Sequence, residues 1–168
     1  MKKVYMISPS LQPTVQVKEG ADGSSLGLGY LHAVLVGDGY AVETFNYNNK
    51  PLELSEKEIA EKIKAGDPDF FLVQIFTMNR VAAKRAIALA RRLKPGVTVV
   101  AGGIHASLYS AQVLEFYGAD YVVIGEGERT VLELLGALSA GLPLDGVKGI
   151  AYRREGKVVV APARELIE

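Results

Sequence analysis

The sequence predicts an α/β fold built on a parallel sheet, and three observations support this. Short β-rich runs alternate with segments of helical period along most of the chain. Two of the runs, Phe70–Phe76 and Val97–Ala101, are almost continuously apolar, as in strands that helices cover on both faces. Apolar residues make up 49% and charged residues 23% of the 168 residues, which is typical of one globular domain.

The N-terminal quarter contains two strands and one helix. Lys3–Ser8 is a β-rich run closed by Pro9, which has no N–H for a central ladder. The polar segment Ser10–Ser25 has no helical period and is expected to be a loop, either a lid over the binding site or disordered. Leu26–Asp38 has helical spacing, and Tyr40–Tyr47 alternates as a second strand.

The middle of the chain contains two helices around the apolar strand Phe70–Phe76. Ser55 is expected to cap the first helix, with Glu58 completing a capping box, and Pro68 ends it. Asn79 is expected to cap the second helix. The apolar stripe of that second helix comprises Ala82, Ala86, Leu89, Ala90 and Leu93.

The rest of the chain continues the alternation and then departs from it. A short helix over Ala111–Tyr117 precedes the strand Tyr121–Ile124, and an amphipathic helix follows. Gly149–Arg153 and Lys157–Val160 flank Glu155-Gly156, which is typical of a β-hairpin. We therefore predict a flavodoxin-like, Rossmann-type sheet of five parallel strands in the order 2-1-3-4-5 over residues 1–144. Residues 145–168 are expected to form a separate hairpin and linker. The ligand crevice of such a sheet lies at the carboxyl ends of strands one and three.

Composition excludes several classes of function. Lys plus Arg and Asp plus Glu are both 19, so the clustered positive charge of a nucleic-acid surface is not expected. The chain has no cysteine, which excludes disulfides, thiolate metal sites and cysteine nucleophiles, and two histidines do not make a zinc site unaided. No apolar run approaches ~20 residues. The expectation is therefore no membrane association and a cytoplasmic protein.

Candidate ligand contacts lie where strands end. Gly102-Gly103 either allows a ligand to approach the backbone or makes a tight turn. Gly125–Glu128 either contacts a ligand or is a turn whose acids complement a helix dipole. His105 on the same edge is expected to hydrogen-bond rather than bind a metal, whereas His32 is expected to pack within its helix. Thr77-Met78 follows the third strand and faces the crevice in the predicted order.

Three common binders of this architecture do not fit the sequence. A phospho-acceptor receiver needs acidic residues after the first strand, where Ser8-Pro9-Ser10 stands instead. A flavodoxin phosphate loop needs hydroxyl residues around a glycine at the same place, and the segment up to Pro13 lacks them. The pair Gly27-x-Gly29 lies within a helix and has His32 where a dinucleotide fingerprint requires a third glycine.

Motifs in a fixed order over almost the whole chain carry a family resemblance. The motifs are Val4–Pro9, Leu26-Gly-Leu-Gly-Tyr-Leu-His-Ala-Val-Leu35, Gly39-Tyr40, Pro68-Asp69, Phe76-Thr-Met-Asn-Arg80, Val99-Val-Ala-Gly-Gly-Ile-His-Ala-Ser107, Asp120-Tyr-Val-Val-Ile-Gly-Glu-Gly-Glu128, and the hairpin Gly149–Tyr152 with Gly156-Lys157 and Pro162. In order and spacing they resemble the N-terminal cobalamin-binding domain that precedes the barrel of many cobalamin-dependent radical SAM enzymes.

The resemblance implies a cobalamin whose nucleotide tail extends into the crevice of the sheet. A phosphodiester and an aromatic base require backbone donors and an apolar slot more than charge. The residues that the resemblance places at the cofactor are Ser8, Thr77, Met78, Gly102, Gly103, His105, Ser107, Gly125, Glu126 and Gly127.

Two departures from related cobalamin proteins refine this expectation. Neither His32 nor His105 stands in an Asp-x-His-x-x-Gly motif, so the cobalamin is expected to be base-off with no protein histidine on cobalt. The cysteines of a 4Fe-4S cluster are absent, so the cluster and S-adenosylmethionine belong to a radical SAM domain of a longer chain, from which this sequence is expected to be a piece.

The resemblance leaves the reaction open: methyl transfer is typical of the family, while some relatives perform ring formation or rearrangement. This chain alone is not expected to be catalytic. Two other hypotheses remain at this point. One is a cobalamin-free recognition module on the same fold, and the other is a flavin or nucleotide pocket, which the missing phosphate loop disfavours.

Overall fold

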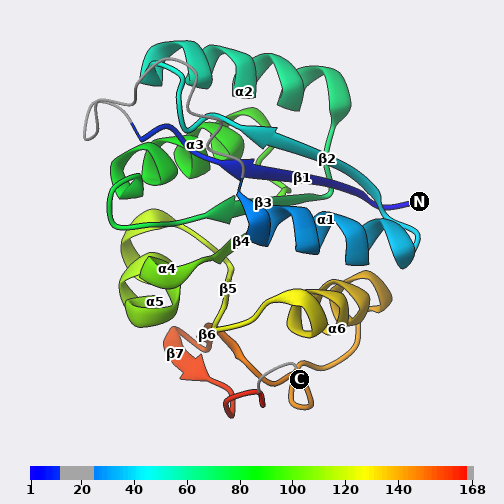
Figure 1. The fold of residues 1–168 in the computed structure, drawn as a ribbon. Coiled ribbons are helices and arrows are strands. Elements are labelled where there is room, and N and C mark those ends of the chain that lie inside the picture. The colour runs from blue at the N-terminus through cyan, green and yellow to red at the C-terminus, as the bar shows by residue number, and fades with distance from the viewer. Residues whose placement is uncertain (12–24, 166–168) are drawn as a thin grey trace.

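The computed structural model describes residues 1–11 and 25–165 and contains a seven-stranded sheet of order β2-β1-β3-β4-β5-β6-β7 (Figure 1). The first five strands pair in parallel, which confirms the predicted order 2-1-3-4-5. The strands are β1 (Lys3–Ser8), β2 (Ala41–Asn46), β3 (Phe70–Gln74), β4 (Thr98–Gly102), β5 (Tyr121–Val123), β6 (Ile150–Arg154) and β7 (Lys157–Val160).

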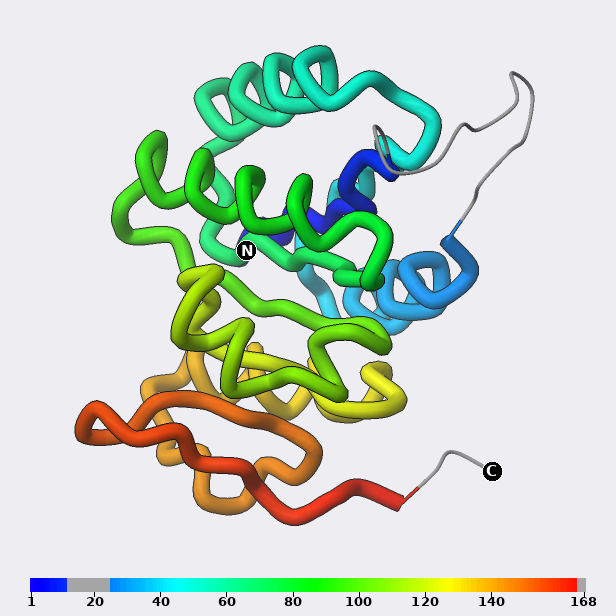
Figure 2. Tube along the Cα trace, turned by 90° about the vertical axis from the view of Figure 1, so that its left-hand side faces the viewer, coloured from blue at the N-terminus to red at the C-terminus, as the bar shows by residue number. Residues whose placement is uncertain are grey.

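Helices cover both faces of the sheet and divide the core into two clusters. The helices α1 and α6 pack Leu35 and Leu134 against one face, while α2, α3 and the α4–η1 segment cover the other (Figure 1). Figure 2 shows α2 and α3 side by side. The bounds are α1 (Leu26–Gly37), α2 (Leu52–Gly66), α3 (Arg80–Leu93), α4 (Ile104–Leu108), α5 (Ser110–Gln112), the π-helical turn η1 (Val113–Tyr117) and α6 (Glu128–Ala140). None of the helices in residues 1–11 and 25–165 has the length and apolar character of a transmembrane span.

The C-terminal hairpin extends the sheet, so the prediction of a sheet of only five parallel strands is wrong. Strand β6 pairs antiparallel with β5, with Ala151 opposite Val122, and β7 pairs antiparallel with β6. Ile150 and Ala151 of β6 are fully buried. Without β6, strand β5 would be the edge of the sheet, with its backbone hydrogen-bonding groups and apolar side chains exposed. The hairpin itself is confirmed: both turn residues, Glu155 and Gly156, have positive φ, as its short turn requires.

The second helix begins earlier than the sequence predicts. It starts at Leu52 after Pro51, and the buried hydroxyl of Ser55 donates to the Leu52 carbonyl at 2.7 Å instead of capping the helix. The carboxylate of Glu58 accepts from Lys50 Nζ at 2.6 Å, so no capping box forms. Proline is tolerated at a helix start because the first N–H groups have no intrahelical acceptor, and the helix therefore extends back to it.

Asn79 precedes α3 as predicted, but its side chain does not cap that helix. It is 1% exposed, and its Oδ1 accepts from the Phe76 N–H at 2.8 Å. Its Nδ2 donates to the Gln74 carbonyl at 3.2 Å and to the Pro9 carbonyl at 3.5 Å. One buried amide thus links the loops that follow β1 and β3.

We predict that Asn79→Ala lowers the free energy of unfolding by about 1–3 kcal/mol, since it leaves buried backbone groups of two loops without partners. Urea denaturation of the two proteins measures the difference. The control is Gln112→Ala, because Gln112 is exposed. Equal stabilities of the Asn79 and Gln112 variants would contradict a structural role for the amide.

Candidate functional site

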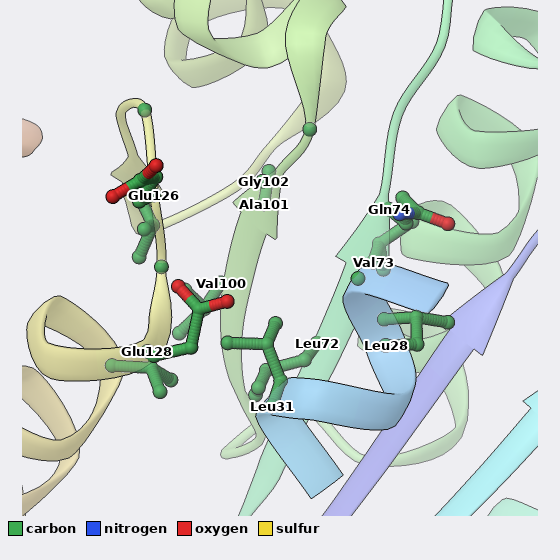
Figure 3. Close-up of a pocket in the computed structure, with 16 residues that line it drawn as sticks. Leu28, Leu31, Leu72, Val73, Gln74, Val100, Ala101, Gly102, Glu126 and Glu128 are labelled. Carbon is green, nitrogen blue, oxygen red and sulfur yellow. The ribbon is translucent and has the colours of Figure 1, made fainter. Parts of the chain in front are cut away.

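A cavity of about 210 Å³ opens at the carboxyl ends of β3, β4 and β5, between α1 and α6 (Figure 3). Leu28 and Leu31 come from α1, three positions apart and therefore on one helix face. The residues that line the cavity are Gly27, Leu28, Leu31, Leu72, Val73, Gln74, Val100, Ala101, Gly102, Gly103, Val123, Gly125, Glu126, Gly127, Glu128 and Val131.

The cavity lies further along the sheet than the crevice predicted at strands one and three. Among the described residues, β1 contributes nothing to its lining. Ser8 at the end of β1 is fully buried and donates its hydroxyl to Asn48 Oδ1 at 2.7 Å. The Asn79 amide joins the loops after β1 and β3, so that end of the sheet is filled by the protein's own polar groups. Most of the predicted loop at Ser10–Ser25 lies outside the described residues.

Gly102 and Gly103, at the end of β4, are glycines for different structural reasons. Gly103 has φ +92°, and a Cβ on it would lie 2.8 Å from the carbonyl oxygen of Ile75, so the chain itself requires glycine there. A Cβ on Gly102 would meet nothing closer than the Val123 oxygen at 4.0 Å. Gly102 lies two residues after Val100 and therefore on the same face of β4, toward α1 and α6, where its lack of a side chain keeps the cavity floor open.

The turn after β5 forms the opposite wall. Gly125 has φ +78°, and its N–H donates to Ser107 Oγ at 3.0 Å, so α4 holds this turn in place. A Cβ on Gly127 would come within 3.2 Å of Leu31 Cδ2, so glycine lets α1 approach this wall closely. Glu126 is exposed at the rim.

Two polar lining residues were missed by sequence reasoning. Gln74, the last residue of β3, accepts from Ser25 Oγ at 2.7 Å and so connects the start of α1 to the sheet. Glu128 lies in the first turn of α6, where the helix dipole favours a carboxylate. Figure 3 shows the Glu128 side chain reaching into the cavity beside Leu31. Gln74 is the one polar residue of the apolar run Phe70–Phe76, and that exception could have marked it, whereas Glu128 was interpreted only as a complement to the helix dipole.

His105 lies outside the cavity lining, on α4 at the opposite face of the sheet. It is buried, with Nδ1 3.1 Å from Thr77 Oγ1 and Nε2 3.5 Å from the Tyr117 hydroxyl. Its ring also contacts Tyr109, with centroids 4.9 Å apart. Burial, and then the charge of Arg80, lower the pKa of His105 below its ordinary value, which favours the neutral ring.

The ten predicted site residues therefore separate into groups. Gly102, Gly103, Gly125, Glu126 and Gly127 line the cavity. Thr77, His105 and Ser107 link neighbouring strand-end loops, Ser8 is buried at the end of β1, and Met78 is half exposed on the same edge. The structure thus brings the glycine segments together at one cavity. Most of the side chains that were predicted to contact a ligand instead form hydrogen bonds with other residues of the protein.

The family model of the B12 binding domain matches residues 14–135, a segment that contains all of the cavity lining given above. The chain belongs to the B12-binding domain family. An uncharacterized methyltransferase of Pyrococcus horikoshii is 34% identical over 167 residues, which are 99% of this chain and 36% of that protein. The anaerobic magnesium-protoporphyrin IX monomethyl ester cyclase of Rubrivivax gelatinosus is 35% identical over 144 residues, covering 83% of this chain and 26% of that protein.

Among solved structures, the radical S-adenosylmethionine methyltransferase TsrM from Kitasatospora setae, with cobalamin and a [4Fe-4S] cluster bound, has the same fold. The TM-score is 0.81 at 22% identity, and the match covers all of this chain and 30% of that one. This B12-binding domain therefore spans roughly a third of the length of each of these proteins or less.

A cavity of this size would hold one part of a cobalamin and not the whole cofactor. Its volume of about 210 Å³ is below the range of about 300–1,000 Å³ that drug-sized ligands occupy. Leucine and valine side chains make most of the wall, and two carboxylates and one amide supply its polar side chains. An apolar slot with few polar groups suits a flat aromatic base joined to a sugar, which is the chemistry of the nucleotide tail.

We predict that Gly103→Ala and Gly102→Ala differ in stability although they are neighbours. Alanine at 103 adopts a positive φ against the Ile75 carbonyl and should cost about 1–3 kcal/mol of unfolding free energy. Alanine at 102 has open space and should change it by less than about 0.5 kcal/mol. Urea denaturation measures both values. A Gly102 variant that loses as much as the Gly103 variant would refute the assignment of an open cavity floor.

We also predict that stability falls as the pH is lowered below about 6.5 because of His105. Its folded-state pKa is lowered, so the unfolded chain takes up the proton first, and stability present above the unfolded pKa is lost as the pH falls through the folded value. Unfolding free energies at pH 7.5, 6.5 and 5.5 should decline more steeply for the wild type than for His105→Gln. Parallel declines would show that His105 is not the group responsible.

Proposed function

We propose that this domain binds cobalamin in the base-off form and holds it for a catalytic radical SAM domain of a longer protein. The observation that supports this most is the apolar cavity between α1 and α6 at the carboxyl ends of β3 to β5, in a chain of the B12-binding family. The nucleotide tail would enter that cavity, and the corrin ring would lie above the edge of the sheet.

The residues that would hold the cofactor fall into two sets. Gly102, Gly103 and the Gly125–Gly127 turn would border the tail, with Leu28 and Leu31 packing on its base. Thr77, Met78, His105 and Ser107 would lie under the corrin, where Met78 already exposes 51% of its surface. Ser8 would act from the β1 side through its bond to Asn48.

The absence of a protein histidine from the lower face of cobalt is supported by the partners of the two histidines. His105 has both ring nitrogens within hydrogen-bond distance of protein hydroxyls, those of Thr77 and Tyr117. His32 places Nδ1 2.9 Å from Thr44 Oγ1. These contacts compete with a bond to cobalt, so the lower face of the cofactor would be left to water or to another side chain.

The catalytic activity of the whole protein would reside in sequence outside this domain. The relatives are about three times as long as this match, and a 4Fe-4S cluster and S-adenosylmethionine would be held by their additional length. Two of them are methyltransferases and one is a cyclase, so methyl transfer is the reaction that we favour for the whole protein. When bound, cobalamin supplies methyl-transfer or redox chemistry, and this domain supplies binding and orientation.

We predict that the purified domain retains hydroxocobalamin through gel filtration as a coloured complex. Its absorbance spectrum should match that of a base-off cobalamin, and His32→Gln and His105→Gln should leave the spectrum of the bound cofactor unchanged. The control is Gly102→Val, which would fill the cavity floor and should abolish retention while the far-ultraviolet circular dichroism stays that of the wild type. A colourless wild-type protein, or equal retention by Gly102→Val, would refute the proposal.

A further inference from the structure

Glu128 carries an unsatisfied oxygen inside the cavity. Among residues 1–11 and 25–165, its Oε2 is the one buried side-chain nitrogen or oxygen atom without a hydrogen-bond partner. The other polar side chains of the lining differ from it: Gln74 accepts from Ser25 Oγ at 2.7 Å, and Glu126 is exposed at the rim.

A buried carboxylate oxygen without a donor is costly, because it loses its hydration and gains nothing in return. The N-terminal position on α6 offsets part of that cost through the helix dipole, but it does not supply a hydrogen bond to Oε2. Leu31 on α1 and Val131 on α6 also line the cavity and have no polar side-chain atoms to offer. An ionised carboxylate only accepts hydrogen bonds, so the missing partner must be an O–H or N–H group.

We infer that Glu128 accepts a hydrogen bond from the ribose hydroxyl of the cobalamin's nucleotide tail, and that it makes the domain selective for corrinoids that carry a complete tail. This inference rests on the proposed function. A neutral benzimidazole in the base-off state has a ring nitrogen that accepts and no N–H that donates, whereas the sugar provides an O–H. Glu128 would therefore bind the sugar while the leucines pack on the base.

The test compares corrinoids with and without the tail. Hydroxocobalamin and dicyanocobinamide, which lacks the nucleotide, are titrated against the wild type, Glu128→Ala and Glu128→Gln, with binding followed by absorbance. Glu128→Ala should weaken hydroxocobalamin by about 10- to 100-fold and leave dicyanocobinamide within twofold, because a hydrogen bond to a charged group is lost only with the tail. Glu128→Gln retains an acceptor and should fall between the wild type and Glu128→Ala.

A matched control separates this from a general effect of charge. Glu115 is exposed on η1, so Glu115→Gln should bind both corrinoids as the wild type does. A third probe, a cobamide with p-cresol as its base, keeps the ribose but has no base nitrogen. The Glu128→Ala loss should persist with it. A loss that disappears would overturn the ribose assignment in favour of a protonated base.

Two further outcomes would overturn the role of Glu128 altogether. One is an equal loss for hydroxocobalamin and dicyanocobinamide, and the other is no loss for either. These outcomes are distinct from failure of the proposed function, in which the wild type itself binds neither corrinoid. Thermal unfolding of each variant without ligand, with midpoints within a few degrees of one another, establishes that the comparison is made between folded proteins.

Discussion

The close approach of Gly103 to Ile75 is the contact on which the site depends. The Ile75 N–H donates to the Gly102 carbonyl at 2.8 Å, and its carbonyl accepts from the His105 N–H at 3.1 Å. These bonds continue the β3–β4 ladder past its last pair and start α4, and no side chain fits between the two segments. Because β3 and β4 end together, Gln74 and Gly102 lie opposite each other and form the floor of the cavity.

The two faces of the sheet contribute to the site in different ways. On the face of α1 and α6, apolar side chains do not fill the space at the strand ends, and this leaves a cavity. On the other face, polar side chains join the strand-end loops to one another, as Thr77 does with His105 and Ser107 does with Gly125. A cavity with walls already fixed requires little ordering when a ligand enters, so less binding free energy is lost to conformational entropy.

Local signals explain what could be predicted from the sequence. Phe70–Phe76 was recognised as a strand because apolar residues without a period belong in the middle of a covered sheet, and glycine pairs marked the ends of the strands. The pairing of β6 with β5 could not be predicted, since it depends on an exposed edge far away in the sequence. Asn79 was misassigned because the residue before a helix usually caps it, and the buried carbonyl of Pro9 came from another part of the chain.

The site itself was predicted only where the backbone determined it. The turn at Gly125 follows from a strand end, but the contribution of Leu31 depends on how α1 rotates against the sheet, which spacing alone does not fix. Side chains such as Ser107 were expected at a ligand because they stand on the correct edge, yet a short hydroxyl satisfies the nearest N–H first, here that of Gly125. Position along a parallel sheet therefore predicts which loops meet, while competition among nearby donors and acceptors decides which side chains are left for a ligand. Glu128 Oε2 is the buried side-chain oxygen that this competition leaves without a partner in the described chain, and for that reason it carries more information about the ligand than the residues whose hydrogen bonds are complete.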